Sequence, residues 1–154
     1  MMKKILFGLF WALALVACKE VFDPPPQALL QVKVKYVDEE ATGSPKVSVY
    51  GVDMDDTIWI YQEITSDFRL PMSAKTETSF VILLDSIADT LTITHDKELI
   101  FESAESGFYN EYKILDVKHT FNRIEDYEVT DSAVTKNWHE NIQLYINSLP
   151  ADAN

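Results

Sequence analysis

Apolar and polar residues alternate at every second position in several stretches of this chain. In residues 30–36, the apolar residues stand at even positions while Lys33 and Lys35 stand between them. Residues 89–94 and 142–146 show a similar alternation. Successive side chains of a β-strand point to opposite faces, so the pattern predicts strands with one buried face. The chain is therefore expected to build its core from strands.

Other short segments extend this pattern through most of the chain. We expect further strands at 46–52, 57–61, 68–71, 79–84, 99–103 and 109–121. Turn residues separate them, as in Gly43-Ser44-Pro45, and no stretch of ten residues has the apolar spacing of a helix. Eight or nine short strands with frequent turns favour an all-β fold, an antiparallel immunoglobulin-like β-sandwich.

The same alternation predicts the orientation of individual side chains. The residues expected to be buried are Val32, Val34, Ile82, Leu84, Leu91, Ile93, Leu144 and Ile146. Those expected to point outward are Lys33, Lys35, Thr92 and Gln143. A shift of one residue in register would exchange the two faces, so burial of the second set would contradict this assignment.

The first eighteen residues differ in composition from the rest. Lys3 and Lys4 precede an apolar run at 5–14, which is about half the ~20 residues that a helix needs to cross a bilayer. A charged start followed by a short apolar run is typical of a cleaved signal peptide. Leu15-Val16-Ala17-Cys18 then resembles a bacterial lipobox, in which lipid is attached to the cysteine. This resemblance predicts lipidation of Cys18 and anchoring in the cell envelope, with the outer membrane as the expected location and the leaflet left open.

These observations give the expected domain boundaries. Residues 1–17 form the cleaved signal peptide, 18–28 the lipidated cysteine and a stalk, 29–149 the β-sandwich, and 150–154 a tail. The three consecutive prolines at 24–26 favour the stiff polyproline II conformation in the stalk. Lys19-Glu20, directly after the cysteine, weakly resembles an export signal of Bacteroidota lipoproteins.

Charge and cysteine content limit the chemistry. The mature chain would have 25 acidic and 11 basic side chains, a net charge of −14. This charge disfavours nucleic acid and anionic lipid surfaces as partners. Cys18 is the only cysteine, so no thiol would remain for a disulfide, a thiolate metal site or a cysteine nucleophile.

Two groups of residues are candidate ligand sites. Asp53, Asp55 and Asp56 place three carboxylates in one loop, where they could hold calcium. The loop lacks the glycine and glutamate of an EF-hand, so a solvated turn is the preferred interpretation. The second group is an aromatic platform for sugar or protein, with packing within the fold as the alternative. It consists of Trp59 and Tyr61 on one strand face, with Tyr50 near them.

Catalytic motifs are weak in this sequence. His139-Glu140 begins like a zinc-protease helix, but Gln143 stands where the second histidine is needed. Asp96, Glu98, Glu102 and Glu105 are close in sequence, which does not place two carboxylates across a cleft. We therefore expect no catalytic residue and no cofactor. The favoured function is a non-catalytic binding or assembly module with an envelope protein or glycan partner. The alternatives are an envelope glycan hydrolase and a calcium- or sugar-binding accessory module.

Four segments carry a resemblance to a known family. They are Val47–Gly51, Asp89–Thr94, Phe101–Ser103 and Ser106–Tyr109. Together they resemble a family of small uncharacterised lipoproteins of the Bacteroidota, classed as a domain of unknown function. The resemblance covers residues 31–146 and implies an envelope location and a β-fold, but no activity.

The resemblance also implies a difference in covalent structure. The family pattern has a cysteine before the glycine, where this chain has Ser106, and another near the N-terminus, where this chain has Val21-Phe22-Asp23. A family disulfide is therefore implied to be absent here. Such a bridge stabilises a fold by roughly 2–4 kcal/mol, which the core of this chain would have to supply.

Overall fold

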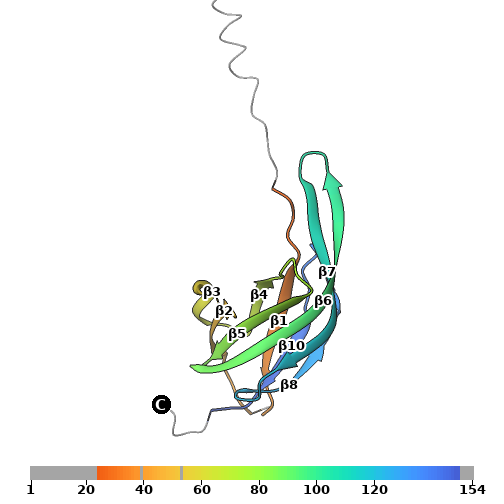
Figure 1. Ribbon diagram of the computed structural model, residues 1–154. Helices are drawn as coiled ribbons and strands as arrows, with labels where there is room; N and C mark the ends of the chain where they lie inside the picture. Colours follow the sequence, from red (N-terminus) through yellow and green to blue (C-terminus); the bar gives the residue numbers. More distant parts are fainter. Residues whose placement is uncertain (1–23, 39, 53, 150–154) are drawn as a thin grey trace, which may run out of the picture.

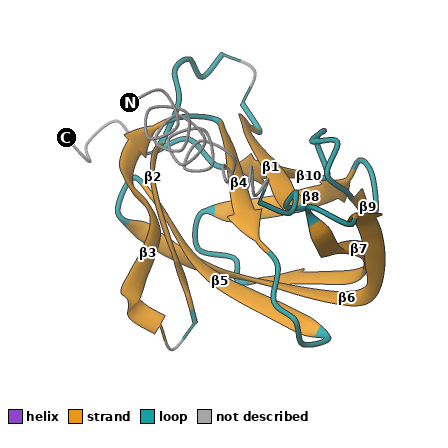
Figure 2. Ribbon diagram, turned by 90° about the horizontal axis from the view of Figure 1, so that it is seen from above, coloured by secondary structure: helices purple, strands orange, loops and turns teal. Residues whose placement is uncertain are grey.

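The computed structural model describes residues 24–38, 40–52 and 54–149 of the chain. These residues form ten β-strands in two sheets, and no helix is found among them. Figure 2 shows the strands of both sheets from above. The expected all-β class is therefore confirmed.

The smaller sheet has four strands in the order β4-β1-β10-β8. Their bounds are β1 Leu29–Tyr36, β4 Asp67–Pro71, β8 Ile124–Val129 and β10 Ile142–Ile146. β1 and β10 are parallel, with Val32 opposite Ile142, while the other two pairings are antiparallel. The expectation of a wholly antiparallel fold is wrong at this pair. A parallel pair needs a long connection between its strands, and here most of the domain provides it.

The larger sheet has six strands in the order β3-β2-β5-β6-β7-β9, and all its pairings are antiparallel. Their bounds are β2 Lys46–Gly51, β3 Met54–Ile64, β5 Glu77–Leu84, β6 Ile87–Ser103, β7 Gly107–His119 and β9 Ala133–Val134. β5 and β6 are joined by Asp85 and Ser86, both with positive φ. Positive φ at both loop residues is the geometry of a type I′ hairpin, which matches the twist of the strands.

The hydrophobic core takes its residues from both sheets. All eight residues that the alternation predicts as buried are buried: Val32, Val34, Ile82, Leu84, Leu91, Ile93, Leu144 and Ile146. Lys35 is exposed, and Lys33 and Thr92 are partly exposed. The prediction for Gln143 is wrong, because this side chain is buried and its amide donates a hydrogen bond to the hydroxyl of Tyr145. β10 is a central strand, so neighbouring side chains cover even its outward face.

A buried carboxylate fixes the chain after β7. Both oxygens of Asp89 accept hydrogen bonds, from the backbone N–H groups of Asn122, Arg123 and Ile124 at 2.7–2.9 Å and from the hydroxyl of Thr120 at 2.6 Å. Buried backbone donors need such acceptors. Asp89 therefore satisfies three backbone N–H donors, and the hydroxyl of Thr120, where the chain leaves β7 and enters β8.

Candidate interaction surfaces

The hairpin of β6 and β7 extends beyond the rest of its sheet as a two-stranded ribbon (Figure 1). β6 pairs with β5 only as far as Thr94, and β7 pairs with β9 only at Tyr112 and Lys113. Among the described residues, those at 96–111 therefore have only each other as strand partners. We call this part of the hairpin the arm.

One face of the arm is apolar and exposed. Leu99, Phe101 and Phe108 are exposed to 63%, 59% and 57%, and we call these three residues the arm patch. Phe101 lies directly opposite Phe108, with ring centroids 5.2 Å apart, and Leu99 lies two residues before Phe101 on the same face. An isolated two-stranded ribbon is at best marginally stable in water. The exposed apolar face of this ribbon is therefore a candidate interaction surface.

The base of the arm is fixed by a buried polar cluster. The Nε2 atom of His95 lies 2.8 Å from the hydroxyl of Thr78, and its ring meets that of Tyr112 edge-on at 5.2 Å. The hydroxyl of Tyr112 donates a hydrogen bond to the carbonyl of Met72 at 3.2 Å. Burial lowers the pKa of His95, so the ring is neutral at pH 7 and the cluster carries no net charge.

The N-terminal segment runs beside the arm. Residues 25–29 and 108–110 line a shared groove with a volume of about 300 Å³, together with Met72 and Tyr112. The indole of Trp138 donates a hydrogen bond to the carbonyl of Gln27 at 3.0 Å and holds this segment against the body. Figure 1 shows the segment leaving β1 on the side to which the arm points. The chain before Pro24 thus joins the body at its arm end.

A second exposed apolar surface lies on the edge strand β3, which pairs only with β2. Trp59 and Tyr61 are exposed to 45% and 67%, and Ile58 and Ile64 are also exposed. We call these four residues the β3 surface. Tyr50 is partly exposed on β2, opposite Ile58. The exposure that an aromatic platform requires is therefore present, while binding by it stays a prediction.

Irregular pairing shapes this edge. The register between β2 and β3 shifts at three points, and Gln62 has a positive φ of 51°. Bulges of this kind interrupt the row of backbone donors and acceptors to which another strand would add. The backbone of β3 is therefore poorly suited to pairing with another strand, and its side chains are the groups it presents to solvent.

Several predictions fall on residues that the structure does not describe. Asp53 and the side chains of Asp55 and Asp56 are among them, so the calcium prediction stays a prediction. Cys18 and the signal peptide also lie outside the described residues, as does the tail at 150–154. In the described part of the chain, no three His, Cys, Asp or Glu side chains are grouped as metal ligands. No helix in that part is long and apolar enough to cross a membrane.

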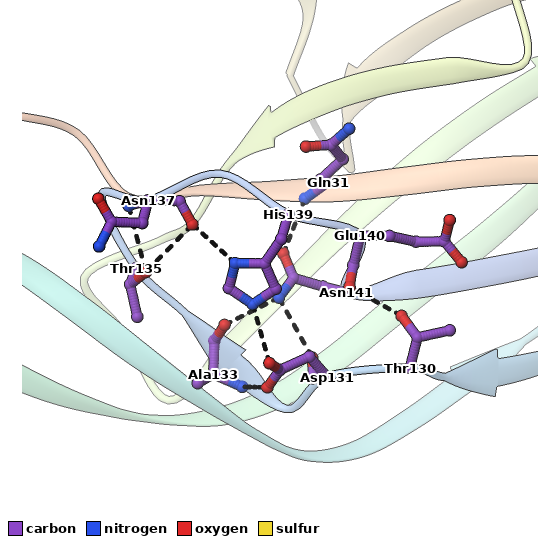
Figure 3. A network of polar contacts seen from close by, with 9 residues as sticks. All are labelled: Gln31, Thr130, Asp131, Ala133, Thr135, Asn137, His139, Glu140 and Asn141. Atoms are coloured by element: carbon purple, nitrogen blue, oxygen red, sulfur yellow. Dashed lines mark hydrogen bonds and ion pairs between the residues drawn. The ribbon is translucent and has the colours of Figure 1, made fainter.

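His139 belongs to a polar network in the segment before β10 (Figure 3). Its Nδ1 donates to the carbonyl of Asn137 at 2.7 Å, and its Nε2 lies 2.9 Å from a carboxylate oxygen of Asp131. The side chain of Asn141 accepts from the backbone N–H of Gln31 at 3.0 Å and donates to the carbonyl of Asp131 at 3.2 Å. The network connects this segment to β1.

The zinc-protease resemblance at His139-Glu140 does not hold. The two residues lie in a loop before a strand, not on a helix, and Gln143 is buried in β10. Glu140 forms an ion pair with Lys33 at 3.3 Å. The Nδ1 of His139 donates to the carbonyl of Asn137 and its Nε2 faces the carboxylate of Asp131, so the ring is positioned by its own loop and has a structural part.

The acidic residues of the arm do not converge on a common centre. Glu98 lies opposite Glu111 across the ribbon and, with Asp96 and Lys113, lines a second groove of about 520 Å³. Glu102 instead binds Lys136 at 2.6 Å. Glycosidases use two carboxylates at a set separation across a cleft, and the pairing of Glu98 with Glu111 on one ribbon does not by itself provide that arrangement.

Sequence reasoning did not identify the arm patch. Phe101 and Phe108 are part of the family resemblance, but no pattern assigns them a common face. Their pairing follows from the turn at 104–106, which sets the register of β6 against β7. The signal that was available is the run Leu99-Ile100-Phe101, whose consecutive apolar residues place apolar side chains on both faces of a strand.

Two sheets and a projecting arm define an all-β protein, and comparison with known proteins gives its family. The chain belongs to a family of unknown function, DUF6452, which matches residues 46–146. This agrees with the expectation of an uncharacterised family. No curated protein and no solved structure matches the chain.

Proposed function

We propose that this protein is a lipid-anchored module of the bacterial cell envelope that binds a partner and catalyses no reaction. The β3 surface carries the proposal. Four large apolar side chains are exposed along the edge strand β3, and exposed apolar surface of this kind marks interaction sites in folded proteins. The sequence from Lys3 to Cys18 supports the location, because it combines a signal peptide with a lipobox-like site.

The finer description of the fold is part of this proposal. Two packed sheets with a common core support an immunoglobulin-like sandwich. The arm and the parallel pair of β1 and β10 would be additions to that architecture. In such sandwiches, edge strands and loops supply the binding surfaces while the core keeps them rigid.

The composition of the β3 surface favours a protein as the partner. Trp59 and Tyr61 are residues enriched at protein interfaces, and Ile58 and Ile64 add aliphatic area beside them. A glycan site would also need polar groups placed around an aromatic ring, and the exposed Gln62 and Glu63 beside Tyr61 keep a glycan as the alternative. We therefore propose an envelope protein as the partner and treat a glycan as the alternative.

The experiment places a photo-reactive amino acid at Tyr61 in cells that produce the full chain. The matched control carries it at Phe121, which is exposed to 75% and lies in the loop after β7, far from β3 in sequence and strand order. We expect one discrete adduct with an envelope protein from position 61, lost when Trp59 is replaced by Ser, and no such adduct from position 121. Equal labelling at both positions would contradict a specific β3 surface.

The glycan alternative has a separate measurement. In the Trp138→Phe variant, Trp59 is the only tryptophan of the mature chain. Its fluorescence should not change on titration with envelope glycans if the partner is a protein. A saturable change that Tyr61→Ala abolishes would favour the glycan.

A further inference from the structure

We propose that the arm patch of Leu99, Phe101 and Phe108 rests on the lipid bilayer that holds the anchor. The arm would then be a second, apolar point of contact between the domain and the membrane. This inference rests on the proposed lipid attachment at Cys18. It is independent of the partner proposed for the β3 surface.

The first observation is that the arm and the N-terminal segment point to the same side of the domain. Residues 25–29 share a groove with 108–110, so the N-terminal segment lies against the arm. The tip of the arm extends past the point at which the described chain begins, at Pro24 (Figure 1). A membrane attached to the chain before Pro24 therefore lies on the side to which the arm points.

The second observation is that the chain between Cys18 and Pro24 is short. Six residue steps separate Cys18 from Pro24, and an extended chain covers at most ~3.6 Å per residue, so Pro24 stands no more than about 22 Å from the lipidated cysteine. The arm occupies part of this gap because its tip extends past the start of the described N-terminal segment (Figure 1). The short tether thus keeps the arm patch near the bilayer.

The third observation is that the arm patch is small. Three side chains on a ribbon two strands wide offer far less area than the ~1,000 Å² that a specific protein interface needs. A weak contact becomes effective when a tether already holds the two surfaces together, because the local concentration is then high. The anchor holds the arm close to the bilayer at all times. It brings the arm close to a second copy of the chain only when many copies are present on the same membrane.

Charge decides which lipids the arm prefers. Glu102 is paired with Lys136, but Glu98 and Glu105 are exposed on the arm without an ion-pair partner among the described residues. The mature chain also has a net charge of −14. Repulsion from anionic headgroups opposes contact, so the apolar residues should enter a zwitterionic surface more readily.

The test uses the full lipidated chain in phosphatidylcholine vesicles. Phe101→Cys is labelled with a polarity-sensitive fluorophore, since lipidation leaves no other free thiol. The control is Phe121→Cys with the same label, at the opposite end of β7 from the arm tip. We expect a blue-shifted emission at position 101 that nitroxide lipids quench, and water-like emission at position 121.

Three outcomes of the vesicle experiment would overturn the inference, each for a different reason. A chain that does not float with the vesicles overturns the anchor and, with it, this inference. A floating chain with water-like emission at position 101 overturns only the inference. A blue shift without nitroxide quenching, lost when fewer chains are loaded per vesicle, identifies a second copy as the occupant and also overturns it.

Lipid composition gives a further check on the same samples. Replacing part of the phosphatidylcholine by phosphatidylglycerol should reduce the blue shift at position 101, and added salt should restore it. A second variant, Leu99→Ser with the label still at position 101, should also reduce the shift. No effect of either change would show that the label itself, and not the arm patch, enters the bilayer.

Discussion

His95 is the buried residue whose charge state depends most directly on pH. Burial lowers its pKa, so below its ordinary value of ~6.5 the unfolded chain takes up a proton that the folded chain resists. The free energy of unfolding should be unaffected by this group above about pH 6.5 and should fall as the pH decreases through the lowered pKa.

Urea unfolding at pH 7.5 and pH 5 measures this effect. We expect His95→Gln to lose less stability than the wild type between the two pH values. The control is His119→Gln, which replaces a partly exposed histidine outside the cluster at the base of the arm. An identical acid response in the wild type and both variants would contradict a role for His95.

Asp89 permits a prediction about hydrogen bonding. Asp89→Ala leaves the backbone donors of Asn122, Arg123 and Ile124 without their acceptor, and unsatisfied buried groups cost about 1–3 kcal/mol each. With partial relaxation we expect a total loss of about 2–5 kcal/mol. Asp116→Ala, which removes only an exposed ion pair with Lys118, should change stability by less than about 1 kcal/mol.

Among the structural elements, the core strands could be predicted from the sequence and the arm could not. β1, β5 and the first half of β6 each place one face in the core, so their apolar residues alternate. In the arm, Asp96, Lys97 and Glu98 are all exposed because this part of β6 lies beyond the core and beyond its pairing with β5. A charged run of this kind is typical of a loop, and it conceals the continuity of a strand of 17 residues.

The remaining differences have related causes. β8 has exposed residues on both faces, including Glu125 and Asp126, so it shows no clear alternation. β9 has only two residues. Gln143 is buried because β10 has neighbours on both sides, which depends on the chain order of the whole sheet. Trp59 and Tyr61 could be predicted as a candidate aromatic platform from their spacing, since residues at alternate positions of a strand share a face.

The arm patch should contribute little to the stability of the domain. Phe101→Ser removes an exposed ring and should change the free energy of unfolding by no more than about 0.5 kcal/mol. Tyr112→Ala, at the buried base of the arm, should cost about 3–5 kcal/mol because it leaves a cavity beside His95. Denaturant unfolding compares the two. A large loss of unfolding free energy for Phe101→Ser would show that the arm patch stabilises the fold and is not free to contact another surface.

At the scale of the whole molecule, the predicted anchor separates attachment from folding. Cys18→Ala should convert a membrane-fraction protein into a soluble one, because it removes acyl chains whose methylenes contribute ~0.8 kcal/mol each. The ten strands should remain, since none of them includes Cys18. Fractionation with a high-salt wash, followed by circular dichroism, measures both. A cleaved variant that stays in the membrane pellet would point to another anchor.

The parallel pairing of β1 with β10 has a consequence for how the protein reaches its native state. Gln31 and Asn141, which bond across this pair, are 110 residues apart in the chain. Contacts of such long sequence separation slow folding. A chain released from its N-terminus, as the proposed export requires, frees β1 first, and this strand then has an open edge until the last part of the chain arrives. Open edges invite mispairing, so the time between these two events is when a newly released molecule is most prone to aggregate.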